Sequence, residues 1–287
     1  MEFLQPGSLD EALAMKAEQP AALPIAGGTD VMVEINFDAR RPEALLDLTR
    51  IPALTAWSRE SGTLRIGAGV SYSRLVSELG SSLPGLAMAA RTVGSPQIRN
   101  RGTIGGNLGS ASPAGDCHPV LLAAGALVEV ASVRGRRELR VSEFFTGPKR
   151  SALEPDELIT AVLVPVAPGP QQFAKIGTRN AMVIAVCAFA LELRVDGRNA
   201  GTGIGSAGPT PLRAVEAEEF LAARLPWDSP GPLAESLTRE FGALAAAAAR
   251  PIDDVRGTAE YRRHALSVLA RRTLTWAWDA YLEERSD

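Results

Sequence analysis

The chain has 287 residues, of which 46% are hydrophobic and 22% charged, a composition typical of a globular protein of about two domains. Its 30 basic and 33 acidic residues are interspersed and leave a net charge of −3, which excludes the basic footprint of a nucleic-acid-binding protein. The N-terminal residues lack the pattern of a secretory or organellar presequence, and no apolar run approaches the ~20 residues of a membrane span. We therefore expect a cytoplasmic protein with no nucleic-acid partner and no membrane span.

Side chains that bind metals are scarce. The chain has two cysteines, Cys117 and Cys187, and two histidines, His118 and His264. These are too few for the four thiolates of an iron–sulfur cluster or for the clustered ligands of a zinc site, so we expect no metal in this chain. We interpret the adjacent Cys117 and His118 as packing residues at the start of a helix, because no catalytic cysteine signature surrounds them.

The first 56 residues or so predict a small lobe of alternating helices and strands. Its predicted elements are a helix opened by the capping-box pair Ser8 and Glu11, strands at residues 23–26 and 44–48, and a helix capped by Thr29 or Asp30. Between the first strand and the second helix lies the sequence Ala-Gly-Gly-Thr-Asp, residues 26–30, which we name the first glycine segment.

A second lobe is predicted from about residue 57 to residue 172. Its pattern begins with a strand at residues 63–66, a helix opened at Ser71, another helix after Pro84, and an apolar helix near residues 119–126. Residues 93–116 between these helices are so rich in glycine that we predict an irregular loop. The central part of that loop, residues 102–107, has the sequence Gly-Thr-Ile-Gly-Gly-Asn and is the second glycine segment.

Both glycine segments have the composition of an anion-binding turn. Glycine permits positive φ and lets backbone N–H groups approach a ligand closely, so Gly105 and Gly106 with Thr103 and Asn107 predict a nest for a pyrophosphate. The first segment lies between a strand and a helix, where its N–H groups would also favour phosphate. Two such segments would hold one diphosphate from both sides. Neither has the spacing of a Rossmann or P-loop motif, and each alone is more often a structural turn.

The predicted secondary structure changes near residue 172 from alternating strands and helices to a hairpin followed by helices. We therefore predict a second domain at residues 173–287. Residues 182–195 alternate as a strand, Asp196 and Gly197 predict a hairpin, and a returning strand runs through Ile204. Three helical patterns follow at residues 211–225, 232–250 and 258–284. We interpret Trp276 and Trp278 in the last helix as core residues, because aromatic side chains at helical spacing usually pack inward.

A series of short motifs, spread in order over nearly the whole chain, resembles a known family. Besides the two glycine segments it includes Ala-Ser-Pro-Ala-Gly-Asp at residues 111–116, Asp-Glu-Leu-Ile at 156–159, Phe-Ala-Lys at 173–175 and Asp-Val-Arg-Gly at 254–257. The series resembles the FAD-binding medium subunit of the xanthine dehydrogenase and carbon monoxide dehydrogenase family of molybdenum hydroxylases. The resemblance implies an α+β fold: a two-lobed FAD domain similar to that of vanillyl-alcohol oxidase flavoproteins, then a C-terminal domain of sheet and helices.

The resemblance also implies roles for individual residues. Matching positions in the family contact the FAD diphosphate, ribityl chain, hydroxyls or ring, and we carry them over to Ala26, Gly27, Gly28, Thr29, Asp30, Thr103, Ile104, Gly105, Gly106, Asn107, Asp116, Ile159 and Lys175. Asp116 would accept from FAD hydroxyls, although it is also well placed to cap the following helix. A lysine beside the flavin would stabilise the anionic reduced ring, although a solvated charge at the end of a strand is the ordinary alternative for Lys175.

Three further residues keep more than one interpretation each. Ile184 matches an apolar residue that covers the flavin in relatives, and it is equally suited to the core of its strand. Arg99 and Arg101 flank the second glycine segment and could pair with phosphate, with acidic residues of partner subunits, or with water alone. We favour contacts with partner subunits for both.

The function implied by the resemblance is electron transfer. In this family a large subunit carries the molybdenum cofactor, a small subunit carries [2Fe–2S] clusters, and the FAD subunit passes electrons to NAD⁺, a quinone or another acceptor, in a dimer of heterotrimers. No catalytic side chain is then required of this chain. The alternative is a self-sufficient flavin oxidase of the vanillyl-alcohol type, which needs a substrate pocket with acid–base groups; the last domain is small for that purpose. The substrate and the acceptor are not readable from this chain.

Overall fold

The first lobe is built on a small parallel sheet. The computed structural model describes residues 1–285, and it orders this sheet β1-β3-β2. The elements of the lobe are β1 (Glu2–Leu4), α1 (Leu9–Glu18), β2 (Leu23–Ile25), α2 (Val31–Asn36), β3 (Ala44–Asp47) and α3 (Pro52–Thr55). Helix α1 begins as predicted, because Ser8 Oγ accepts from the Glu11 N–H at 3.2 Å and Glu11 in turn accepts from the Gly7 N–H at 2.7 Å.

The second lobe is an antiparallel five-stranded sheet with helices packed on one face. Its strands, in the order β4-β5-β10-β6-β7, are β4 (Trp57–Glu60), β5 (Thr63–Gly67), β10 (Leu158–Pro165), β6 (Leu127–Ser132) and β7 (Gly135–Arg140). Its helices are α4 (Tyr72–Glu78), α5 (Pro84–Thr92), α6 (Pro96–Arg101), α7 (Ile104–Ser110), α8 (Cys117–Ala123) and α9 (Val141–Phe144). A two-stranded ribbon, β8 (Phe145–Gly147) and β9 (Arg150–Ser151), completes it.

The prediction that residues 93–116 form an irregular loop is wrong, because two short helices, α6 and α7, lie inside it. Each helix has a hydroxyl N-cap that the glycine content obscured: Ser95 Oγ accepts from the Ile98 N–H at 3.3 Å, and Thr103 Oγ1 accepts from the Gly106 N–H at 3.0 Å. Pro96 stands in the first turn of α6, where its missing N–H costs nothing. Caps therefore outweigh the weak helix propensity of glycine here.

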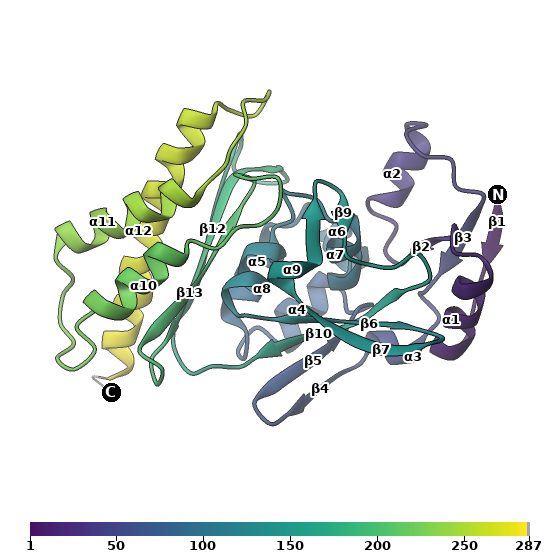
Figure 1. Ribbon diagram of the computed structural model, residues 1–287, viewed down its shortest axis with the longest axis horizontal. Helices are drawn as coiled ribbons and strands as arrows, with labels where there is room; N and C mark the ends of the chain where they lie inside the picture. The colour runs from purple at the N-terminus through teal and green to yellow at the C-terminus, as the bar shows by residue number, and fades with distance from the viewer. Residues whose placement is uncertain (286–287) are drawn as a thin grey trace.

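The C-terminal domain is an antiparallel sheet covered by three helices. Its elements are β11 (Gln171–Gly177), β12 (Ala185–Arg194), β13 (Asn199–Gly205), α10 (Val215–Arg224), α11 (Glu235–Ala248) and α12 (Ala259–Glu284). Figure 1 shows α10, α11 and α12 on one face of this sheet and α5 and α8 of the preceding lobe on the other. The predicted α+β fold, with its hairpin and helical end, is confirmed; the exact domain boundary at 172/173, which falls inside β11, stays a prediction.

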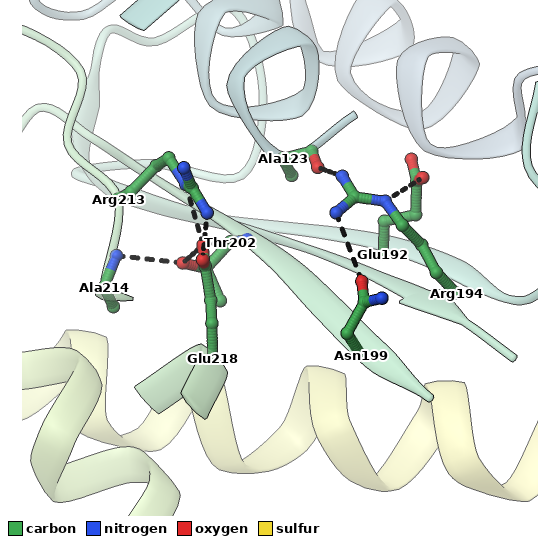
Figure 2. A network of polar contacts seen from close by, with 8 residues as sticks. All are labelled: Ala123, Glu192, Arg194, Asn199, Thr202, Arg213, Ala214 and Glu218. Carbon is green, nitrogen blue, oxygen red and sulfur yellow. Dashed lines mark hydrogen bonds and ion pairs between the residues drawn. The ribbon is translucent and has the colours of Figure 1, made fainter. Parts of the chain in front are cut away.

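Glycines let helix α8 lie directly on the C-terminal sheet. A Cβ at Gly201 or Gly203 of β13 would overlap the carbonyl oxygens of Ala123 or Pro119, so only glycine fits at these two positions. At the edge of the same contact, Arg194 donates to the Ala123 carbonyl and at 3.2 Å to Glu192 (Figure 2). The two domains therefore share a close interface rather than a flexible hinge.

A buried carboxylate fastens the other face of the sheet. Glu218 of α10 accepts from the N–H and hydroxyl of Thr202 at 2.8 and 2.7 Å and from Arg213, as Figure 2 shows. Because every oxygen of the buried carboxylate is paired, the helix is held in one register on β13. Within the described residues, no helix is both long and apolar enough to cross a membrane.

Candidate functional site

The first glycine segment is a tight turn between β2 and α2. Gly28 has φ +74°, a left-handed conformation that side-chain-bearing residues resist, and its carbonyl accepts from the Met32 N–H at 3.0 Å. Within residues 1–285, the backbone N–H groups of Gly27, Gly28 and Thr29 have no hydrogen-bond partner. Asp30 is exposed and stands at the N-cap of α2 without a capping side-chain bond. Three consecutive free donors are what an anion needs.

The second glycine segment has different chemistry from the predicted nest. Gly105 and Gly106 lie in the first turn of α7 and do not have positive φ. Their N–H groups are already used: that of Gly105 donates to Ala68 O at 2.9 Å, and that of Gly106 to Thr103 Oγ1 at 3.0 Å. The Ile104 and Asn107 N–H groups donate within the protein as well, at 3.1 and 3.0 Å. The prediction of a backbone-donor nest at this segment is therefore wrong.

The second segment offers a bare surface, meaning an exposed stretch of backbone that no side chain covers. Gly106 and Gly109 are exposed on the same side of α7, and a Cβ at Gly106 would meet only Thr103 Oγ1, at 3.1 Å. Gly105 faces inward, where a Cβ would lie 2.5 Å from the Ala68 Cβ. Glycine at 105 thus permits α7 to pack against Ala68, the residue after β5, whereas glycine at 106 leaves room for a ligand outside the chain.

The structure brings the two glycine segments into contact. A Cβ on Gly27 would overlap the carbonyl oxygen of Arg101 and would lie 2.9 Å from the Gly102 nitrogen. Only a residue without a side chain allows this approach, so the turn after β2 rests on the peptide that joins α6 to α7. The predicted juxtaposition of the two segments is present in the fold.

Asp116 and Lys175 form a buried ion pair across the two domains. Lys175 Nζ donates to Asp116 Oδ2 at 2.6 Å and to the Thr92 carbonyl at 3.2 Å, and both charged side chains are over nine-tenths buried. The Thr92 hydroxyl donates to the same Oδ2 at 3.0 Å. Burial raises the pKa of Asp116 against the opposing effect of Lys175. The solvated-lysine interpretation of Lys175 is therefore wrong, and so is the capping interpretation of Asp116, which makes no cap bond.

Two acceptor atoms of the candidate site are buried without a partner in the described part of the chain. Asp116 Oδ1 and Asn107 Oδ1 both lack a hydrogen bond within the described residues. Leaving such an atom unpaired costs on the order of 1–3 kcal/mol, so a donor from outside the chain would be favoured here. Ile159 is buried at a bulge of β10, and its Cδ1 lies under α7, 3.7 Å from where a Gly109 Cβ would stand.

Cys117 and His118 pack at the start of α8, as predicted. Both are fully buried, and His118 lies against Phe145 with ring centroids 4.5 Å apart. Burial lowers the pKa of His118 to about 4, so the ring is neutral at physiological pH. His118 Nε2 lies 3.0 Å from the Asn107 carbonyl and donates to it, because a carbonyl only accepts. Burial raises the pKa of the Cys117 thiol, which makes it unreactive.

Of the remaining predictions, some are confirmed and others are wrong. Arg99 donates to the carbonyls of Val93 and Gly94 at 3.1 and 2.9 Å. Ile184 is 60% exposed and so is not a core residue. Trp278 is buried as predicted, but Trp276 is 45% exposed, which contradicts its core interpretation. Sequence reasoning missed Thr92, because nothing in the order of residues signals that its hydroxyl meets Asp116.

These groups fit FAD. The free N–H groups of residues 27–29 suit the oxygens of a diphosphate, and the unpaired acceptors of Asp116 and Asn107 suit the hydroxyls of its ribose and ribityl chain. Gly106 and Gly109 leave the space that so large a cofactor needs beside α7. No excess of basic side chains is required, since neutral N–H groups bind phosphate well at close range.

Comparison with known proteins agrees with this geometry. The family described as the FAD binding domain in molybdopterin dehydrogenase matches residues 1–167, and the CO dehydrogenase flavoprotein C-terminal domain matches residues 172–277. The nicotinate dehydrogenase FAD-subunit of Eubacterium barkeri is 36% identical over 77% of this chain and 79% of its own length. The nicotine 6-hydroxylase medium subunit of Paenarthrobacter nicotinovorans is 31% identical over 96% of this chain and 97% of its own.

Solved structures give the same result. A chain of the carbon monoxide dehydrogenase from Hydrogenophaga pseudoflava superposes with a TM-score of 0.89 at 29% identity, covering 97% of each chain. Because both domains match over nearly their whole length and in order, the predicted family is confirmed. The chain belongs to the FAD-binding medium subunits of the molybdopterin dehydrogenases, the xanthine and carbon monoxide dehydrogenase family.

Proposed function

We propose that this chain is the electron-transfer subunit of a molybdenum hydroxylase complex. In that complex a large subunit oxidises the substrate at a molybdenum cofactor, a small subunit relays electrons through [2Fe–2S] clusters, and this chain holds the FAD. When bound, FAD supplies an electron carrier that takes up single electrons and delivers a pair to NAD⁺, a quinone or another acceptor. The contact between the two glycine segments is the single observation that carries this proposal, because it places free donors beside bare surface.

The thirteen predicted residues act in this proposal through four groups. The turn at residues 26–30 gives N–H donors to the diphosphate, and the first turn of α7, residues 103–107, gives a surface on which the cofactor rests. Asp116 accepts from a cofactor hydroxyl through Oδ1, while Lys175 holds Oδ2. Ile159 supports α7 from the sheet side.

The ion pair also has an electrostatic role in the proposal. Lys175 is nearly buried, so its charge is poorly screened by water, and it would favour negative charge on a reduced cofactor nearby. Because Lys175 belongs to β11 and Asp116 to the start of α8, the pair also fixes the C-terminal domain against the cofactor lobe. The residues therefore bind, orient and tune a cofactor; none of them is needed as an acid, a base or a nucleophile.

The partners follow from the relatives. Several are medium chains of dehydrogenases, such as the carbon monoxide dehydrogenase medium chain of Afipia carboxidovorans, which is 31% identical over 95% of both chains. For this chain we propose a large and a small partner, a dimer of heterotrimers and a cytoplasmic location.

Selective removal of FAD tests the proposal. The complex stripped of FAD should still let substrate reduce its iron–sulfur clusters within one turnover, whereas reduction of the natural acceptor should cease. Added FAD should restore it, and a dye that accepts from the clusters should restore turnover without FAD. Undiminished reduction of the acceptor by the stripped complex would show that electrons leave by another route.

A further inference from the structure

Tyr72 is a buried tyrosine whose hydroxyl makes no hydrogen bond within residues 1–285. It is the first residue of α4 and only 3% exposed. Its hydroxyl oxygen is not among the fully buried unpaired side-chain atoms of the described residues, so this end of the side chain is accessible from outside the chain. A tyrosine with a buried ring normally pairs its hydroxyl with a protein group or with water. The Tyr72 hydroxyl is therefore free to donate to a ligand.

The position of Tyr72 is directly beneath the contact between the two glycine segments. Its backbone N–H donates to the Gly102 carbonyl at 3.1 Å, and a Cβ on Gly102 would lie 2.9 Å from Tyr72 Cε2. Gly27 approaches the same peptide through the Arg101 carbonyl. The peptide that joins α6 to α7 is thus packed both by the tyrosine ring and by the first glycine segment.

Charged residues of the candidate site surround the same tyrosine. Burial raises the pKa of Tyr72 well above 10, and the charges of Asp116 and Asp30 add to this effect, as would that of Cys117. Asp30 belongs to the first glycine segment and Asp116 to the start of α8, so the hydroxyl lies within electrostatic reach of both. At physiological pH the phenol is neutral and remains a donor.

The second glycine segment has few free donors of its own. The N–H groups of residues 104–107 all donate within the protein, and Thr103 Oγ1 accepts from Gly106. Within residues 1–285, the Thr103 N–H and the side-chain amide N–H groups of Asn107 are left without a partner, so a diphosphate on this side would meet only a small number of donors. Beside the same segment lies Tyr72, a buried side chain whose hydroxyl makes no hydrogen bond within the described residues.

We propose that Tyr72 is a further FAD-contacting residue, whose hydroxyl donates to an oxygen of the diphosphate from beneath the second glycine segment. This rests on the FAD site proposed above and adds to it a side-chain donor on the α7 side, where most backbone N–H groups already donate within the protein. A neutral phenol suits an anion, because it offers one directed hydrogen bond without bringing a second charge into the buried site.

The variant Tyr72→Phe removes the hydroxyl and keeps the ring that packs on Gly102. Using the full chain freed of FAD, the dissociation constants of FAD, ADP-ribose and riboflavin would be measured for parent and variant. ADP-ribose carries the diphosphate without the flavin, and riboflavin carries the flavin without phosphate. We expect FAD and ADP-ribose to bind about tenfold more weakly, since a hydrogen bond to a charged group contributes about 1.5–3 kcal/mol, with riboflavin unchanged.

A matched control separates loss of the contact from loss of folding. Tyr281→Phe changes another buried tyrosine, one whose hydroxyl accepts from Arg285 at 3.2 Å in the C-terminal domain, and it should leave all three affinities unchanged. The apo-protein of Tyr72→Phe should melt no lower than the parent. Equal affinity of Tyr72→Phe and parent for FAD, or an equal loss for riboflavin, would overturn the proposal. A parent chain that binds no FAD would instead overturn the function proposed above.

Discussion

The two glycine segments have similar compositions, yet their glycines serve different purposes. In the first, Gly28 adopts positive φ and the turn leaves three N–H groups free for a ligand. In the second, Gly105 and Gly106 are helical, and their N–H groups are consumed by Ala68 and Thr103. In the first segment, glycine therefore permits a left-handed turn with free N–H donors. In the second segment, glycine only allows other atoms to approach the helix closely. The comparison teaches that a glycine-rich motif has to be read position by position.

A large effect is expected at Gly27, where a side chain would separate the two segments. In Gly27→Ala the new Cβ would overlap the Arg101 carbonyl, and overpacking of this kind costs about 1–3 kcal/mol. Because the strain falls on the contact itself, FAD affinity should fall by up to about 100-fold, the equivalent of about 2.7 kcal/mol. Titration of the apo-protein with FAD checks this.

The control for this change is Gly7→Ala. Gly7 also lies before a helix, but a Cβ there would meet only Glu11 Oε2, at the ordinary distance of 3.7 Å. Its FAD affinity should equal that of the parent. If Gly27→Ala also bound FAD normally, the two segments would not act together.

A smaller effect is expected from His118, which supports the second segment and has no counterpart at the first. The pKa of His118 is about 4 in the folded chain and near 6.5 in the unfolded chain. Between pH 4 and pH 6.5 the unfolded chain therefore binds a proton at His118 that the folded chain does not bind. The parent is therefore fully stabilised above pH 6.5 and loses stability as pH falls toward 4. At pH 5 this amounts to about 2 kcal/mol.

The measurement is the free energy of unfolding at pH 5 and pH 7 for His118→Phe, which keeps an aromatic ring against Phe145. The variant should lose less stability on acidification than the parent, by about 2 kcal/mol. The same pH dependence in His118→Phe as in the parent would contradict a buried neutral imidazole.

The smallest effect is expected from Arg99, which flanks the second segment. Its guanidinium binds the Val93 and Gly94 carbonyls and is not needed by a diphosphate that already has neutral donors. Arg99→Ala should keep FAD affinity within about twofold, that is within about 0.5 kcal/mol. A tenfold loss of FAD affinity would show that Arg99 contacts phosphate and that the N–H donors of the first segment are not sufficient to bind the diphosphate.

The sequence allowed the order of the elements and the family to be predicted, but not the conformation of the second segment. The helical patterns of α1, α10, α11 and α12 and the Asp196-Gly197 hairpin are strong local signals, and they are confirmed. At α7 the glycines obscure a helix, because its start depends on one Thr103 cap and its stability on packing against β10.

Contacts between residues far apart in the sequence could not be predicted, because local patterns do not show which segments meet in the fold. Lys175 has the composition of a solvated strand residue, and it is buried only because Asp116 and Thr92 meet it from 59 and 83 residues away. Trp276 and Trp278 stand two apart on α12, so their side chains point in different directions and one of them is exposed. The thirteen predicted site residues come from five separate stretches, and which of them contact FAD stays a prediction.

Gly106→Val tests the central claim, that FAD lies against the second segment, most directly. Because Gly106 is helical and its Cβ would point outward, valine should leave the melting temperature of the apo-protein close to that of the parent, while its methyl groups occupy the place of the cofactor. We predict a normally folded chain that no longer retains FAD, measured by flavin absorbance and by thermal unfolding of the same sample. A folded Gly106→Val chain with full FAD content would contradict the account, because the cofactor would then lie elsewhere.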